Sequence, residues 1–203
     1  MALKENTGSR TYLSIREGKI AQKNGEEWTL YNSVEGYIVG ISTRDGKYGT
    51  DLCIDLQDDK LYQLQFRLKG SETGRQSSYF ISFAHCTPNI DPTKKVEFIP
   101  SLKTTEDGKK KAALFLIQDG NPIKWGFKRG DGVLPDPEEI LNKKGEVVSV
   151  DWSEVEVFRV NAVNQFNEKV QSVKTRNTMM VNDPVGDEPV DDTFDTVEDD
   201  LPF

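Results

Sequence analysis

The clearest pattern along the chain is a two-residue alternation of apolar and polar side chains. In the run from residue 61 to residue 69, the even positions are apolar and the odd positions from 63 onward are polar, which predicts a strand with one face toward a core. Residues 51–55 alternate in the same way, while residues 37–44 are rich in β-branched side chains and end at an Asp-Gly turn signal. These three runs predict a strand meander with one apolar and one polar face.

Further strand and turn signals lie on both sides of this meander. A turn at Asp107-Gly108 separates residues 96–103 from residues 111–118, and this spacing predicts a hairpin. About seven short strands in all indicate a mainly β fold, either a sandwich or a small barrel. The remaining predicted elements are a small hairpin over residues 12–21, a turn at 119–122 and a strand at 123–127.

One segment follows a helical period instead. Apolar residues recur every three or four positions after Asp151, and this spacing predicts a helix over residues 153–174 that packs on the barrel. Ser153 and Glu156 have the spacing of a capping box, which would fix the start of the helix. The predicted apolar stripe consists of Val155, Phe158, Ala162, Phe166, Val170 and Val173.

The charge of the chain is unevenly distributed. There are 34 acidic and 26 basic residues, for a net charge of -8, but residues 183–203 contain nine of the acids and no Lys or Arg. The rest of the chain is therefore close to neutral, with 25 acids against 26 bases. We expect one folded domain at residues 1–176 and a disordered acidic tail at residues 177–203, because the tail has too few apolar residues to offset its ordering entropy.

Membrane and redox signals are sparse. The longest apolar run has six residues, Ala112–Ile117, which is too short to cross a bilayer, and the start of the chain lacks a signal-peptide pattern. Two cysteines, Cys53 and Cys86, do not suggest a disulfide framework. These observations favour a reduced, cytoplasmic setting.

Residue constellations typical of enzymes are few. His85 is the only histidine and precedes Cys86, but catalytic partners are usually brought together by the fold, so a buried structural role is the favoured interpretation. A zinc site would need an added carboxylate, and the Gly-Ser-Glu-Thr-Gly run at 70–74 lacks the Lys of a phosphate-binding loop. We expect no catalytic residues, no metal and no cofactor.

The last residues form the most specific motif. Residues 198–203 read Glu-Asp-Asp-Leu-Pro-Phe, starting at Glu198. By average residue usage, such an end arises by chance well under once in about 10⁵ sequences. An acidic solubilising tail would explain the acids but not the apolar end. A terminal ring and carboxylate suit a pocket with a basic rim on a partner protein. The expected partner-binding residues are Asp199, Asp200, Leu201, Pro202 and Phe203.

This tip resembles the C-terminal end of bacterial single-stranded-DNA-binding proteins, and the longer body looks more like the bacteriophage or mobile-element type. The resemblance implies an OB-fold, a five-stranded Greek-key barrel, with extra N-terminal strands and a C-terminal helix. Residues 37–69 would supply the first three barrel strands and residues 96–118 the last two. Residues 77–84 would be a helix or an insertion between them. Oligomeric state, including a homo-oligomer, stays open.

Under this resemblance, positive charge should gather where DNA binds. The segment from Lys94 to Arg129 has nine bases and four acids, a net charge of +5. Lys109, Lys110 and Lys111 follow the hairpin turn and would extend over the strand, although Lys-rich turns are often merely solvated.

The polar face of the third predicted strand is a second candidate. It presents Gln65, Arg67 and Lys69 on the side where an OB-fold holds its ligand, and Arg75 in the next loop could clamp a phosphate. The alternative is an ordinary barrel exterior.

The nucleobases of a DNA strand also need exposed aromatic side chains on which to stack. Tyr48 lies in the turn after Arg44 and Lys47, which makes it the best candidate for stacking. Two other pairs are expected to contribute: Lys124 with Trp125, and Tyr79 with Phe80, of which one would face outward in a strand. Trp125 would fit a core stripe equally well.

We expect the protein to bind single-stranded DNA with little sequence preference during replication, recombination and repair, and to recruit partner proteins through its tip. The alternative from another class is an OB-like adaptor or decoy that engages host replication proteins and binds no DNA. An enzyme built on His85 and Cys86 ranks third. If the gene is carried by a phage, the compartment would be the cytoplasm of the bacterial host.

Overall fold

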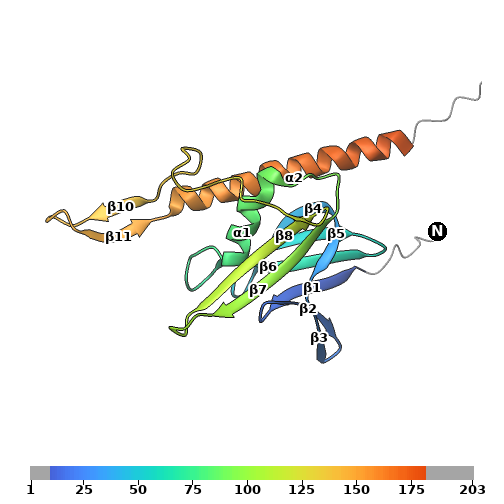
Figure 1. Cartoon of the computed structure of the whole chain (residues 1–203), viewed down its shortest axis with the longest axis horizontal. Helices are drawn as coiled ribbons and strands as arrows, with labels where there is room; N and C mark the ends of the chain where they lie inside the picture. Colours follow the sequence, from blue (N-terminus) through green and yellow to red (C-terminus); the bar gives the residue numbers. More distant parts are fainter. Residues whose placement is uncertain (1–9, 182–203) are drawn as a thin grey trace, which may run out of the picture.

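A computed structural model of the chain describes residues 10–181 (Figure 1). The structure is mainly β, as predicted. The strands are β1 (Thr11–Arg16), β2 (Lys19–Asn24), β3 (Glu27–Tyr31), β4 (Val34–Gly46), β5 (Gly49–Gln57), β6 (Leu61–Gly70), β7 (Val96–Thr104), β8 (Lys110–Gln118), β9 (Asn121–Pro122), β10 (Glu138–Leu141) and β11 (Val147–Asp151). The helices are α1 (Ser78–Cys86), the 3₁₀ turn η1 (Thr87–Asn89) and α2 (Ser153–Val181).

Nine strands form one continuous sheet in the order β3-β2-β1-β6-β5-β4-β7-β8-β9. The long strand β4 joins its two halves, because residues 37–46 pair with β5 while residues 34–36 pair with β7. Among the described residues the sheet does not close into a barrel. The free edge of β6 is occupied by β1, which runs parallel to it, and the outer edge of β8 pairs with the short β9.

The predicted meander and hairpins are confirmed. Strands β4, β5 and β6 follow one another as antiparallel neighbours, and β7 and β8 pair around the predicted Asp107-Gly108 turn. The small N-terminal hairpin turns at Glu17 and Gly18, which both have positive φ angles of 51° and 73°. Such a turn matches the twist of the two strands that it joins.

The core lies between the apolar face of the sheet and the two helices. Leu52, Ile54 and Leu56 of β5 are almost fully buried, as the alternation predicts. Phe83 of α1 belongs to the same core, and its ring makes an edge contact with that of Phe166 on α2, the centroids lying 6.4 Å apart. Burial of side chains of this size contributes about 1.5–3 kcal/mol each.

A glycine fixes the approach of the β4–β5 turn to β6. Gly49 has a φ of +119°, and a Cβ at this position would lie 2.1 Å from the carbonyl oxygen of Lys69. The turn can therefore lie against the end of β6 only because residue 49 has no side chain.

Helix α2 begins at Ser153 as predicted, but the capping box is wrong. The carboxylate of Asp151 fixes the start of the helix instead. Its Oδ1 accepts hydrogen bonds from the backbone N and the hydroxyl of Ser153, at 2.8 and 2.6 Å. Glu156 instead pairs with Lys69. The stripe is confirmed by four buried residues, Val155, Ala162, Phe166 and Val170.

Helix α2 also ends later than predicted. It extends to Val181, seven residues beyond Lys174, so the predicted domain boundary between residues 176 and 177 falls within it. The expected disorder of residues 182–203 lies outside the described residues. Within the described part of the chain, neither helix is long and apolar enough to cross a membrane.

Three strands were missed, and one predicted strand is wrong. Strands β10 and β11 form a separate two-stranded arm that projects from the body (Figure 1), and all its residues are exposed. Strand β3 adds an exposed outer edge to the N-terminal hairpin. The predicted strand at 123–127 is wrong: only Asn121 and Pro122 pair with β8, and the chain then turns toward α1.

Candidate nucleic-acid interface

The first cluster of predicted residues lies on the outer face of β4, β5 and β6. Cross-strand register places Arg44, Asp51 and Arg67 in one row across these strands. The Nη1 of Arg67 lies 3.3 Å from Asp51 Oδ1, and the Nη2 of Arg44 donates to Gln65 Oε1 at 2.9 Å. One carboxylate between two guanidinium groups leaves this row with a net positive charge.

The same face is tied together by amide side chains. Gln65 Nε2 donates to Gln63 Oε1 at 2.7 Å, and Gln63 Nε2 donates to Asp55 Oδ1 at 2.8 Å. Arg10 reaches the other oxygen of Asp55 at 3.3 Å. This ladder holds the polar side chains of β5 and β6 in fixed positions and presents both hydrogen-bond donors and acceptors.

The β4–β5 turn carries the exposed aromatic that the sequence predicts. Tyr48 is 64% exposed, and the Lys47 Nζ lies 5.5 Å from the centre of its ring. The Ser71 backbone N donates to the Tyr48 carbonyl at 3.1 Å, and Gly70 donates to the Arg75 carbonyl at the same distance. These bonds join the turn to the loop after β6 and bring Lys47, Tyr48 and Arg75 to one end of the sheet.

Lys69 belongs to this cluster but has a partner. Its Nζ lies 2.8 Å from Glu156 Oε2 on α2. Exposed pairs of this kind contribute little to stability, so a phosphate can compete for the ammonium group.

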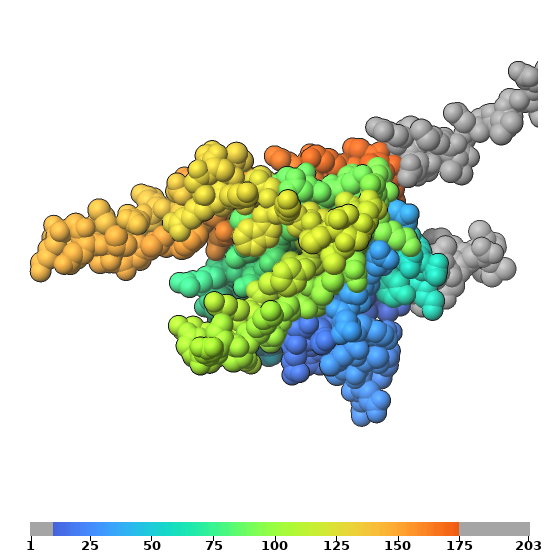
Figure 2. Space-filling model, viewed as in Figure 1, coloured from blue at the N-terminus to red at the C-terminus, as the bar shows by residue number. Residues whose placement is uncertain are grey.

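The predicted lysines of the β7–β8 turn are exposed. Lys109 pairs with Asp107 at 2.8 Å, whereas Lys110 and Lys111 lie on the exposed start of β8. The tip of this hairpin projects from the same end of the molecule as the loop between β6 and α1 (Figures 1 and 2). Two groups of cations therefore extend from this end, one from the β7–β8 turn and one around Lys47 and Arg75.

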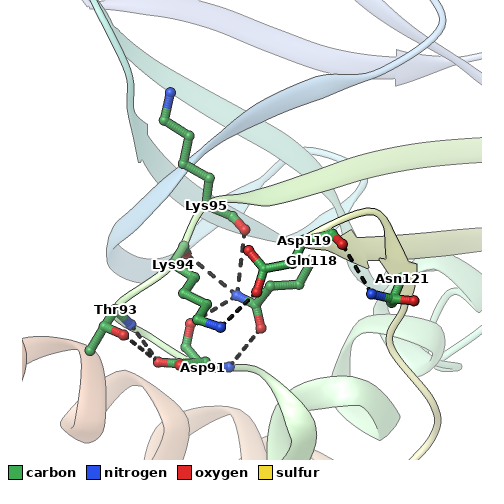
Figure 3. Close-up of polar contacts among 7 residues, drawn as sticks. All are labelled: Asp91, Thr93, Lys94, Lys95, Gln118, Asp119 and Asn121. Carbon is green, nitrogen blue, oxygen red and sulfur yellow. Dashed lines mark hydrogen bonds and ion pairs between the residues drawn. The ribbon is translucent and has the colours of Figure 1, made fainter.

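The basic residues between Lys94 and Arg129 are divided among the two ends of β7 and β8 and the segment after β9. Lys94 lies 2.6 Å from Asp119 Oδ2, and Lys95 lies 2.6 Å from Asp58 Oδ1. Figure 3 shows the network that fixes this end, in which the amide of Gln118 bonds both the backbone N and the carbonyl of Asp91. These two lysines are structural, while Lys109 to Lys111 lie at the other end.

The predicted pair Tyr79 and Phe80 is corrected by the structure. Both lie on α1, where the helical period turns Phe80 into the core with no exposed surface. Tyr79 is half-buried against the same core, and this burial raises the pKa of its hydroxyl. The expectation of an outward-facing residue assumed a strand, and Phe80 cannot reach a base from this position.

Lys124 and Trp125 lie apart from the strand face, in the segment between β9 and the arm. Trp125 is 52% exposed and its ring lies 4.9 Å from that of His85, so it does not belong to the core. Gly126 permits this close approach: its backbone N donates to the His85 carbonyl at 2.7 Å, and a Cβ there would meet Pro88 at 2.7 Å.

The chain beyond Trp125 is shaped by one carboxylate. Asp131 accepts hydrogen bonds from the backbone N of Lys128, Val133 and Leu134, at 2.7 to 3.1 Å. These three donors hold the pKa of Asp131 below its usual range. The resulting loop closes over the start of α2.

Sequence reasoning missed Arg159, which the structure places under this loop. Its guanidinium is buried against His85 and Gln76. A signal was present, because Arg159 falls four residues after Val155, within the stripe that packs inward, where an arginine is unexpected.

His85 and Cys86 do not form a nucleophile and base pair. The Cys86 sulfur points to the Ile123 carbonyl, and burial raises the pKa of this thiol to about 11. His85 instead contacts Phe127 and Arg159. Both cysteines are free, and the part of the chain that is described contains no group of three residues able to hold a metal.

Comparison of the chain with protein-family models, with curated proteins and with solved structures finds no match. The tip residues Asp199, Asp200, Leu201, Pro202 and Phe203 lie outside the described residues. The functional argument therefore depends on the geometry of the body and on the sequence of the tip.

Proposed function

We propose that the protein binds single-stranded DNA with little sequence preference and recruits partner proteins of replication, recombination and repair through its C-terminal tip. One observation carries the proposal. The β4–β5 turn and the β7–β8 turn present exposed cations, with Tyr48 exposed among them, and the outer face of β5 and β6 carries half-buried polar and cationic side chains. Phosphates need local cations and bases need exposed rings.

The connection of the strands supports an OB-like arrangement. Strands β4 to β8 supply five strands in the expected order, with β4 shared between β5 and β7 and with α1 between the third and fourth. OB-folds bind oligonucleotides on their second and third strands and on the loops after the first and fourth strands. In this chain those parts correspond to β5, β6, the turn at Lys47 and Tyr48, and the turn before Lys109.

The adaptor alternative expects a face without clustered cations and exposed aromatics. The cluster of Lys47, Tyr48 and Arg75 at the end of β6 favours DNA instead. Recruitment through the tip is compatible with both functions and does not distinguish them.

Binding of a fluorescent oligothymidine and of duplex DNA of equal length, at low salt, tests the proposal. We expect tight binding to the single strand and weak binding to the duplex. Equal affinity for both, or no binding to either, would refute the function.

A lysine variant tests the assigned surface. Replacing Lys109, Lys110 and Lys111 by Ala should reduce the dependence of log K on log salt by about 2, because each single-strand phosphate contact contributes about 0.7. Replacing Lys94 and Lys95, which lie at the opposite end of the hairpin and are both ion-paired, by Ala serves as the control and should leave the slope nearly unchanged. Equal slopes for both variants would exclude the β7–β8 turn from the interface.

A further inference from the structure

A cavity of about 320 Å³ lies between the end of α1, the start of α2 and the loop that precedes the arm. Its walls are mainly apolar and aromatic, and the residues that matter most are Trp125, Phe127, Trp152, Arg129 and Arg159. We call it the indole pocket, after its two tryptophans. It is separate from the outer face of β5 and β6.

Arg159 gives this pocket an unusual electrostatic character. The side chain is only 8% exposed, yet none of the ion pairs among residues 10–181 includes it. Its Nε donates to His85 Nε2 at 3.1 Å, and its Nη1 lies 3.4 Å from Gln76 Oε1. Both hydrogen-bond partners of this buried guanidinium are neutral, and Glu156 acts on it only through its charge, without an ion pair. Burial of a guanidinium in this way is costly, and an anion in direct contact with it would reduce that cost.

His85 is held in the neutral form that suits this arrangement. Its Nδ1 donates to the Phe127 carbonyl at 3.2 Å, so Nε2 is free to accept from Arg159. Burial, together with the charge of Arg159, lowers the pKa of His85. The imidazole therefore orients the guanidinium without adding a second charge.

Two half-exposed indoles line the same cavity. Trp125 is 52% exposed and Trp152 is 41% exposed, although rings of this size usually bury most of their surface. A planar aromatic ligand between them would bury the remaining faces. An aromatic wall beside a buried cation that has no ion-pair partner is suited to an aromatic anion.

A chain of polar contacts connects the pocket to the proposed DNA surface. Lys69 at the end of β6 pairs with Glu156, and Gln76 Nε2 donates to the Glu156 carbonyl at 2.9 Å. Gln76 in turn contacts Arg159. Only Glu156 and Gln76 therefore separate Lys69, on the proposed DNA surface, from Arg159 in the pocket.

We propose that the indole pocket binds one nucleotide of the single strand, with its base against Trp125 and Trp152 and its phosphate toward Arg159 and Arg129. This inference rests on the proposed function and extends it to a site outside the strand face. A base together with its phosphate supplies a planar ring for the indoles and a negative charge for Arg159. The phosphate would also compete with Asp136, whose Oδ1 lies 3.9 Å from the Nε of the exposed Arg129.

The chain offers a matched control for the stacking contact. Trp28 on β3 is also 41% exposed but packs under Arg16, with the guanidinium carbon 4.1 Å from the ring centre. We expect Trp152→Ala to weaken oligothymidine binding about tenfold, Trp152→Phe to restore most of it, and Trp28→Ala to leave it unchanged. Equal effects of Trp152→Ala and Trp28→Ala would overturn the proposal.

A fluorescence experiment identifies the occupant. In the variant Trp28→Phe and Trp152→Phe, Trp125 is the only tryptophan, and thymidine dinucleotide with a 5′-phosphate should quench it. A peptide with the sequence of residues 198–203 is the competing ligand. Quenching by the peptide and not by the dinucleotide would overturn the proposal and assign the pocket to a protein terminus.

The two proposals can fail separately. If oligothymidine binds the wild-type protein and the lysine variant weakens it, but Trp152→Ala and Arg129→Ala do not, the pocket assignment is wrong and the proposed function stands. If the wild-type protein binds no single strand at all, both are wrong.

Discussion

Gln118 shows how much one side chain can contribute at the end of a hairpin. Its Nε2 donates to the Asp91 carbonyl at 2.9 Å and lies 3.4 and 3.5 Å from the carbonyls of Lys95 and Lys94, while its Oε1 accepts from the Asp91 backbone N at 3.0 Å. Gln118→Ala would leave several of these backbone groups unpaired. We expect the free energy of unfolding to fall by about 1–3 kcal/mol, measured by urea denaturation.

A neighbouring amide provides the control for this prediction. Asn121 makes one hydrogen bond at the same turn, from its Nδ2 to the Asp119 carbonyl at 3.0 Å, and it is exposed (Figure 3). Asn121→Ala should therefore cost less than 1 kcal/mol, about the value of one exposed hydrogen bond. Equal losses for the two variants would show that the amide of Gln118 does not hold the segment before β7.

His85 makes stability depend on pH. Burial and Arg159 lower its pKa in the folded protein, so below the ordinary value of 6.5 the unfolded chain binds a proton that the native protein does not. The free energy of unfolding should be nearly constant between about pH 7 and pH 8 and fall as the pH decreases from about 6.5 to about 5. At higher pH the raised pKa of Cys86 causes a separate decrease, because the thiol of the unfolded chain ionises first. Urea denaturation across this range measures the fall.

The histidine is the only one in the chain, which makes the control simple. In His85→Gln the fall between pH 6.5 and 5 should disappear, whatever the loss of stability at neutral pH. Acids with lowered pKa values, such as Asp131 and Asp151, act at lower pH and do not interfere. An unchanged pH profile in the variant would exclude His85 as the titrating group.

At the scale of elements, the sequence predicts those that depend on local patterns. The alternation at 61–69 and the Asp107-Gly108 turn identify β6 and the β7–β8 hairpin, and the stripe from Val155 identifies α2. Pairing between distant segments leaves no local pattern, so the parallel contact of β1 with β6, which keeps the sheet open, could not be predicted. The start of α2 at Ser153 was predicted correctly, but the capping box was not, because Asp151, two residues earlier, accepts the hydrogen bonds of Ser153.

The candidate site residues can likewise be separated into those that a local sequence pattern predicts and those that depend on the fold. Tyr48 and Lys110 were predictable because turn signals place them in exposed positions. Phe80 was not, since the choice between helix and strand decides which of two adjacent rings faces outward. The indole pocket assembles residues from three separate segments, of which the sequence analysis named only Trp125 as a candidate for DNA binding.

The arm of β10 and β11 should be dispensable for folding. Its residues are all exposed, and a two-stranded hairpin contributes little stability by itself. Replacing residues 139–150 by a short Gly-Ser linker should change the melting temperature of the body by less than about 3 °C, the effect of a fraction of 1 kcal/mol in a chain of this size. A large decrease, measured by differential scanning fluorimetry, would show that the arm supports the core.

At the scale of the whole molecule, our proposal assigns DNA binding to the body and the recruitment of partner proteins to the acidic end. Residues 183–203 hold nine acids and no base, and a segment of this charge competes with DNA for the cations of the body. Deleting these residues should tighten oligothymidine binding at low salt and abolish capture of partner proteins. Unchanged affinity, measured by fluorescence titration, would refute the competition.

Helix α2 sets a minimum length for that competition. Its 29 residues rise by 1.5 Å each, so the chain leaves the helix at Val181 about 42 Å from Ser153, which lies beside the proposed DNA surface. About 12 extended residues are needed to cover this distance, and 17 residues separate Val181 from Asp199. The length of the helix thus sets how many residues must follow it. Shortening the stretch between Val181 and Asp199 by more than about six residues would leave the tip able to bind partner proteins but unable to reach the DNA site.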